Sequence, residues 1–334
     1  MGNFSEAYSR ARTTLQTKKY AKEWQDFIDT EAKLKLVLGV DCPDVNHGDA
    51  LDKLRARLEK AARKGVLTVF TGNGLDEVIL KACKESDTDA KVGEKAACLK
   101  MLKHLYLERK IGNQDVWVYS PPKAYKKWVF QEIQGDDKPS KNKLTQEREV
   151  YSAGERAVMC DALQEAAAWC HKVQIKLSTP AGEAMVKSWF LDSAATAQNL
   201  TQAIDTLRAG FKTLNTACRS GQLIFSDEPG DRNSGGWKDW AFVYKSEAMK
   251  VLYLQGAFVK AGNSGNKTMC ALTIIHELTH KLLGTNDHRY DYDGLKPTAT
   301  LPFAKTIDNA DSWGYFAADM AGMLSDSDRN RVLS

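Results

Sequence analysis

Apolar residues recur at helical spacing along several segments of the chain. In residues 50–64, leucines at intervals of three and four residues alternate with charged side chains, and Gly65 follows the segment. This spacing places the leucines on one face, so it predicts an amphipathic helix that ends before Gly65. Three more segments show a helical pattern: residues 95–110, 153–173 and 199–217.

Short runs of aliphatic and aromatic residues between these helices predict strands. The run over residues 66–70 is followed by Gly72 and Gly74, which lack the further residues of a nucleotide-binding loop and are interpreted as a turn. Four other runs have the length of strands: residues 116–119, 223–225, 241–244 and 251–254. A last helix is predicted over residues 267–283. Helices, then a small sheet, then a further helix predict an α+β fold.

A polar segment divides the chain into two predicted domains. Residues 134–143 contain Gly and Pro and show no apolar periodicity, which is typical of a linker. We therefore expect a mainly helical domain over residues 1–145 and a second domain over residues 150–334. Residues 1–150 carry 28 basic and 23 acidic side chains, whereas residues 151–334 carry 19 and 20. The excess of positive charge in the first half is interpreted as a solvated surface.

Composition narrows the class of protein without indicating its function. Of the 334 residues, 43% are apolar and 27% charged, as in soluble globular proteins, and the net charge of +4 is too small to indicate a nucleic-acid or membrane-surface partner. The seven cysteines form no C-x-x-C pair and are expected to be buried thiols. The first residues lack an apolar signal segment and no run is long enough to span a membrane, so we expect synthesis in the cytoplasm without a classical signal peptide.

The helix predicted over residues 267–283 contains the sequence His276-Glu277-Leu278-Thr279-His280, an H-E-x-x-H motif. Residues i and i+4 lie one turn apart on the same helical face, so both imidazoles can bind one metal ion. Glu277 would then lie beside the metal, where it can take a proton from water and pass it to a leaving amine. The motif predicts a metal-dependent hydrolase.

A catalytic zinc site needs a third protein ligand, and the residues after the motif offer two. Gly284 can end the helix and turn the chain back towards the metal. Asp287 and His288 both follow within the reach of a short loop. Two histidines with an aspartate and three histidines are both known catalytic sets, so chemistry alone leaves the two residues as alternatives.

Four segments of the second half resemble one family. H-E-x-x-H is followed by G-T-x-D-x-x-Y at residues 284–290, which is the signature of the aspzincin metallopeptidases, the deuterolysin and peptidyl-Lys metalloendopeptidase group. Three other segments are similar to family motifs in the same order: Lys187-Ser188-Trp189-Phe190, residues 251–261 with Y-L-x-G-A-F, and residues 309–317 with N-A-D-x-x-x-Y-F-A. The resemblance implies a zincin-like peptidase fold for the second domain.

The family resemblance also implies roles for individual residues. It implies that one Zn²⁺ is bound by His276, His280 and Asp287, which favours the aspartate over His288. It implies that Glu277 is the general base and that Tyr290 donates a hydrogen bond to the developing oxyanion. The residues expected to contact the substrate are Gly256, Asp311 and Gly314, with Asp311 in the pocket for the side chain after the cut bond.

Three positions depart from the family pattern. Gly314 stands where Lys-specific members carry a second acidic residue, so one carboxylate is left to attract a basic side chain and a strict preference for Lys is not expected. Asp291 replaces the glycine that follows the signature tyrosine. Gln255 and the cysteine-free residues 224–229 stand where secreted fungal members have cysteines, so their disulfides are expected to be absent.

Together these features predict a zinc-dependent endopeptidase that prefers a basic residue after the cut bond. A domain of unknown role joined to such a peptidase suggests a bacterial effector or toxin delivered into another cell, for example by type VI secretion, with residues 1–145 used for loading, targeting or regulation. The expected partners are a protein or peptide substrate and a cognate inhibitor, immunity or delivery protein. The alternatives are a cytosolic housekeeping protease and a catalytically weak peptide-binding module.

Overall fold

The chain forms two compact units in a computed structural model. The N-terminal unit comprises residues 1–153, 224–237 and 247–251, and the C-terminal unit comprises residues 154–223, 238–246 and 252–334. The residues that the structure describes are 3–17, 19–32, 38–39, 49, 52–54, 56–57, 60, 74–84, 92–110, 116–119, 128 and 151–334. Three predicted elements lie largely or wholly outside these residues. They are the helix over residues 50–64, the strand over 66–70 and the linker over 134–143.

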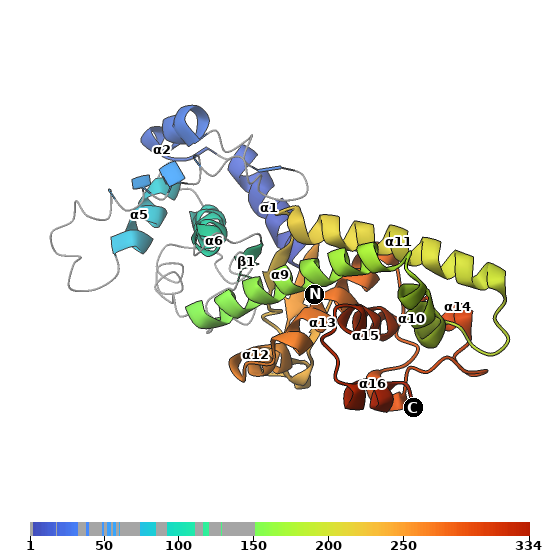
Figure 1. The fold of residues 1–334 in the computed structure, drawn as a ribbon. Coiled ribbons are helices and arrows are strands. Elements are labelled where there is room, and N and C mark those ends of the chain that lie inside the picture. Colours follow the sequence, from blue (N-terminus) through green and yellow to red (C-terminus); the bar gives the residue numbers. More distant parts are fainter. Residues whose placement is uncertain are drawn as a thin grey trace. The chain divides into compact units, whose positions relative to one another are not determined.

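The described part of the N-terminal unit is mainly helical (Figure 1). Its elements before residue 150 are α1 (Phe4–Thr17), α2 (Lys22–Asp26), the π-helix η1 (Phe27–Ala32), α5 (Gly74–Cys83), α6 (Val92–Lys110) and β1 (Trp117–Tyr119). The helix predicted over residues 95–110 and the strand predicted over 116–119 are thereby confirmed. Aromatic rings from α1 and β1 form a buried cluster with Trp128, in which the Phe4 ring lies 5.1 Å from that of Tyr119 and 5.5 Å from that of Trp128.

A small mixed sheet has the strand order β1-β2-β4-β3. β2 (Ile224–Ser226) pairs in parallel with β1, and β3 (Ala241–Phe242) pairs antiparallel with β4 (Val251–Leu254). These strands match three predicted runs, and the expected α+β class is confirmed. The short 3₁₀ turn η4 (Gly235–Lys238) precedes β3.

The C-terminal unit contains the helices that carry the candidate site. They are α9 (Ala153–Lys176), α10 (Pro180–Phe190), α11 (Ala197–Arg219), α12 (Gly256–Asn263), α13 (Lys267–Leu283), the 3₁₀ turn η5 (Asp291–Asp293), α14 (Phe303–Thr306), α15 (Ala310–Met320) and α16 (Asp326–Val332). Several begin at a side chain that caps the first turn; Thr179 accepts from Gly182 N–H, and Asn266 accepts from Met269 N–H. None of the described helices is both long and apolar enough to cross a membrane.

Helix α13 is the central helix of this unit. It has the bounds predicted from the sequence, and it ends at Gly284, whose φ of 78° is left-handed and whose N–H donates to the Thr279 carbonyl. Most of its residues are buried because it packs against α11, α12 and, most extensively, α15. In Figure 1, α13 and α15 lie side by side.

An aromatic cluster fixes α15 against α10 and α11. The Trp313 ring of α15 lies 5.1 Å from that of Phe211 and 6.5 Å from that of Phe190, and its indole N–H donates to the Ile307 carbonyl at 2.8 Å. Gly210 of α11 faces the same indole, so closely that a Cβ at position 210 would lie 2.4 Å from a ring carbon of Trp313. Gly210 therefore permits α11 to approach α15.

We expect Gly210→Ala to destabilise the protein although alanine is the better helix former. The helical preference favours alanine by about 1 kcal/mol, but the new methyl group would displace a rigid, hydrogen-bonded indole, and such overpacking costs about 1–3 kcal/mol or more. Chemical denaturation of the full chain measures the change. Gly235→Ala is the control, because a Cβ there meets no atom within 4 Å; equal stability of the wild type and Gly210→Ala would contradict the close packing.

Candidate metal centre

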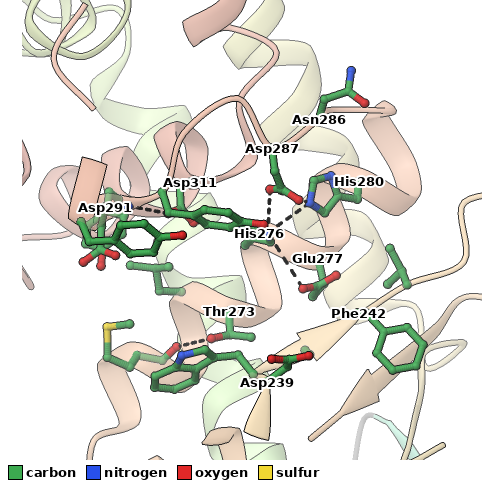
Figure 2. Close-up of a pocket in the computed structure, with 18 of the residues that line it drawn as sticks. Asp239, Phe242, Thr273, His276, Glu277, His280, Asn286, Asp287, Asp291 and Asp311 are labelled. Atoms are coloured by element: carbon green, nitrogen blue, oxygen red, sulfur yellow. Dashed lines mark hydrogen bonds and ion pairs between the residues drawn. The ribbon is translucent and has the colours of Figure 1, made fainter. Parts of the chain in front are cut away.

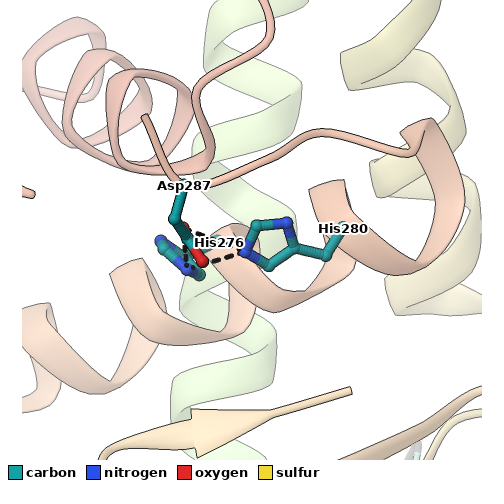
Figure 3. Close-up of side chains that lie close together, drawn as sticks. All are labelled: His276, His280 and Asp287. Carbon is teal, nitrogen blue, oxygen red and sulfur yellow. Dashed lines mark hydrogen bonds and ion pairs between the residues drawn. The ribbon is translucent and has the colours of Figure 1, made fainter. Parts of the chain in front are cut away.

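Two histidines and an aspartate converge at the C-terminal half of α13 (Figure 3). His276 and His280 lie one turn apart on the same face of the helix, and their Nε2 atoms are 3.0 Å apart. The Asp287 Oδ1 atom lies 3.3 Å from Nε2 of His276 and 3.2 Å from Nε2 of His280. Among the described residues, these three form the group of His, Cys, Asp and Glu side chains that could hold a metal ion.

The three separations fit a tetrahedral ion. Zinc bonds to nitrogen and oxygen are about 2.0–2.1 Å long, so two ligands of a tetrahedral zinc are about 3.3 Å apart. The observed separations of 3.0, 3.3 and 3.2 Å are close to this value. With three protein ligands, a fourth position is left for water or substrate, as in catalytic zinc sites.

Each histidine is oriented by a hydrogen bond from its other ring nitrogen. Nδ1 of His276 lies 2.7 Å from Oδ1 of Asp311, and Nδ1 of His280 lies 2.7 Å from the carbonyl oxygen of Thr285. Both partners are acceptors, so each Nδ1 donates a hydrogen bond, and each Nε2 faces the point where a metal would bind. This arrangement is the usual outer support of metal-binding histidines.

The loop that carries Asp287 is held at both ends. Lys245 donates from its Nζ to the carbonyl oxygens of Gly284 and Thr285 and to Oδ1 of Asn286, which also neutralises the carboxyl end of α13. The buried Asn309 accepts at its Oδ1 from the backbone N–H groups of His288 and Arg289, at 2.8 and 3.0 Å. These contacts fix the loop before any metal binds.

Glu277 and Tyr290 lie beside the three ligand atoms. The Glu277 carboxylate is buried, with Oε1 at 4.0 Å from Nε2 of His276, and burial raises its pKa. Tyr290 is 39% exposed. Burial, followed by the charge of Asp287 and a hydrogen bond to it, raises the pKa of the tyrosine to about 12, so its hydroxyl remains a donor at neutral pH.

The ligand carboxylate and the imidazoles shift each other's pKa values. Burial acts to lower the pKa of His276, but hydrogen bonds to Asp287 and Asp311 raise it to about 10. Burial acts to raise the pKa of Asp287, but its hydrogen bonds to both imidazoles hold it well below the usual range. The local charge therefore favours a cation at this point.

The site opens into a cleft of about 730 Å³ (Figure 2). One wall is formed by α13 and the loop after it, and the opposite wall by residues 238–245 around β3. The lining includes the three ligand residues, Glu277, Tyr290 and Asp311. A cleft of this size beside an open coordination position can admit an extended peptide.

The other predicted site residues fall into two groups. Asp311 lines the cleft but also contacts His276, and its Oδ2 accepts from Asp291 N–H at 2.9 Å. Gly256, which begins α12, and Gly314 are not among the described residues that line the cleft. Gly314 instead lies against α13, where an added Cβ would be 3.1 Å from the Leu272 side chain.

The alternative third ligand is directed elsewhere. His288 Nε2 lies 2.8 Å from Oδ2 of Asp308, and His288 is not in the group that could hold a metal. The chemical pattern alone left Asp287 and His288 open, whereas the folded loop brings Asp287 to the two imidazoles. Lys245 and Asn309 were not predicted from the sequence as residues that support the site. Asn309 is the first residue of the N-A-D segment that resembles the family, but the resemblance did not indicate that it binds the backbone of the loop.

Residues 176–318 match the family described as lysine-specific metallo-endopeptidase, the aspzincins. Curated relatives include the peptidyl-Lys metalloendopeptidases of Armillaria mellea and of Grifola frondosa, each 35% identical over 80 residues. These alignments cover 23% of this chain and 22% of each relative, so the chain spans about a fifth of the length of the curated relatives it matches.

The site joins an H-E-x-x-H helix to a third, acidic side chain, and so forms a His-His-Asp cluster. Residues 176–318 are similar to the aspzincin family, whose members the two curated relatives also resemble in name. The family implies zinc as the metal, and the donor set and its separations fit that ion.

We expect His276→Ala to weaken zinc binding more than about 100-fold, because loss of an outer partner alone typically costs about 10–100-fold. His288→Ala is the matched control: it removes a histidine two positions from Asp287 that pairs with Asp308 instead. Competition with a coloured chelator measures both affinities. Equal weakening in the two variants would contradict the ligand set.

Proposed function

We propose that the C-terminal unit is a zinc-dependent endopeptidase that hydrolyses peptide bonds. The observation that carries the proposal is the convergence of His276, His280 and Asp287, with the buried carboxylate of Glu277 beside them in an open cleft. The match of residues 176–318 to the aspzincin family supports the reaction class.

Glu277 is proposed as the general base. Zinc held by the three ligands would act as a Lewis acid and lower the pKa of nearby water. The carboxylate of Glu277 accepts a proton from the attacking water and later donates it to the leaving amine. Its raised pKa supports the first of these steps, because a carboxylate with a higher pKa is a stronger base and accepts a proton from water more readily.

Tyr290 is proposed to stabilise the oxyanion of the tetrahedral intermediate. Its hydroxyl keeps its proton, since its pKa is raised to about 12, and it lies near Asp287 at the edge of the cleft. A donor fixed at the place where negative charge develops contributes a few kcal/mol, roughly 3–4 for one oxyanion donor. The family resemblance gives the same role to this tyrosine.

The broader biological roles stay predictions. They include delivery of the protein into another cell as an effector or toxin, a loading, targeting or regulatory role for residues 1–145, and a cognate inhibitor or immunity partner. A housekeeping protease and a catalytically weak peptide-binding module are the alternatives. The expected zincin-like architecture likewise rests on the family resemblance.

The expected preference for a basic residue after the cut bond also stays a prediction, and the contacts of Asp311 count against a strict form of it. Its two oxygens accept from His276 and from Asp291 N–H, and its side chain is 9% exposed. The position that holds a second acid in Lys-specific members is Gly314, which faces Leu272. We infer that cleavage does not require Lys.

Glu277→Gln is expected to lower the turnover of an unfolded protein substrate at least about 100-fold while the zinc content and thermal stability remain near those of the wild type. The amide keeps the shape of the side chain but cannot accept the proton. Glu183→Gln, on α10 and outside the cleft, is the control. Wild-type turnover by Glu277→Gln would refute the mechanism, and peptide binding without cleavage by the zinc-loaded wild type would support the binding module.

Digestion of a peptide library, read by mass spectrometry, is expected to show Lys enriched no more than about fivefold over apolar residues after the cut bond. A single engaged carboxylate contributes about 1 kcal/mol or less to selecting a partly solvated cation. The Armillaria peptidyl-Lys metalloendopeptidase, digested in parallel, is the reference for a Lys-selective pattern. A tenfold enrichment of Lys by this chain would show that Asp311 is free to bind the substrate.

A further inference from the structure

Asp291, directly after the candidate oxyanion donor, is joined to helix α16 by a charged pair. Its Oδ2 lies 3.0 Å from Nη1 of Arg331. Tyr315, a buried residue of α15, lies close to both partners: burial and the charge of Asp291 raise the pKa of its hydroxyl. The three side chains therefore connect the turn that follows Tyr290 to two helices.

The backbone of the same turn also contacts the residues of α16. Leu295 N–H donates to the carbonyl oxygen of Val332 at 2.7 Å. Gly294 has a φ of 78°, and a Cβ there would lie 2.9 Å from the carbonyl oxygen of Ser334. Close approach of the two backbones thus accompanies the ion pair.

The other side of the turn reaches the metal centre. The backbone N–H of Asp291 donates to Oδ2 of Asp311, and Oδ1 of Asp311 lies against Nδ1 of His276 (Figure 2). The residue that binds Arg331 through its side chain therefore supports, through its backbone, the carboxylate that orients a metal ligand. A shift of this turn would move Tyr290 and loosen Asp311 together.

We propose that Arg331 is a positioning residue for the candidate catalytic site. It holds Asp291 so that Tyr290 faces the cleft and Asp311 keeps His276 in the orientation that binds the metal. Arg331 lies beyond residues 176–318, which match the family, and its partner Asp291 stands where the resembled family has glycine. The inference rests on the proposed peptidase function, and it adds α16 to the parts of the chain that this function needs.

The matched control is on the same helix. Arg329 also pairs with carboxylates, but its partners are Asp319 and Asp326, and Asp319 in turn accepts from the Trp189 indole. Its side chain is 37% exposed, compared with 51% for Arg331. Removing Arg329 leaves a buried carboxylate short of a partner, so it should cost more stability than removing Arg331 but should leave the turn after Tyr290 in place.

At saturating zinc, Arg331→Ala is expected to lower kcat about tenfold with KM changed less than twofold, because small displacements of catalytic groups cost up to about 100-fold in rate. Its affinity for zinc should also fall, because Asp311 would hold His276 less firmly. Arg331→Lys should recover part of the loss, since an ammonium can pair with Asp291 but lacks the guanidinium fork. Arg329→Ala should lower the melting temperature more than Arg331→Ala while keeping wild-type kcat.

Hydrogen exchange provides a readout that does not depend on activity. Backbone amides of residues 290–295 should exchange faster in Arg331→Ala, and at the wild-type rate in Arg329→Ala, in the zinc-loaded full chain. Wild-type kcat or unchanged exchange in Arg331→Ala would overturn the proposal, as would an equal loss of kcat in both arginine variants. If the wild type cleaves no peptide, the proposed function fails, and the exchange rates still decide whether Arg331 holds the turn.

Discussion

The packing of α13 against α15 is the constraint on which the candidate site depends. Gly314 allows α15 to come within contact distance of Leu272, and this proximity brings Asp311 to the imidazole of His276. The residue before α15, Asn309, binds the backbone of the loop that carries Asp287. This helix pair therefore supplies the two histidine ligands, orients His276 and fixes the loop that carries Asp287. The stability of the core and the geometry of the site are coupled for this reason.

A cation would compensate the charge of the carboxylates that this packing buries. Two imidazoles and the carboxylates of Glu277, Asp287 and Asp311 share a small volume, and desolvation of so many acceptors is costly without a cation. Without a metal, the proton on His276 compensates part of the charge, which is why its pKa is raised. A divalent ion would replace that proton and contact all three ligand atoms at once. The arrangement is thus organised for a cation by the fold itself.

Local sequence patterns predicted the parts of the site that depend on one helix and its end. The bounds of α13, the turn at Gly284 and the one-turn spacing of His276 and His280 follow from periodicity and capping. Two contacts could not be predicted in this way, that of Asp311 with His276 and that of Lys245 with Gly284, because each joins segments that are more than 30 residues apart in the chain. The family motif marked Asp311 as important but assigned it to the substrate alone; tertiary packing adds its contact with a ligand.

The two contacts of Asp311 limit what the same carboxylate can do for a substrate. A lysine ammonium that approached it would compete with the proton on Nδ1 of His276 and with Asp291 N–H, so recognition of a basic residue would weaken the support of a metal ligand. A second carboxylate would relieve this conflict, but an acidic side chain at position 314 would enter the space of Leu272. Instead of a second carboxylate, the chain has a closely packed glycine at position 314 and an anchored Asp291. These two features favour a rigid metal centre over selection of a charged substrate side chain.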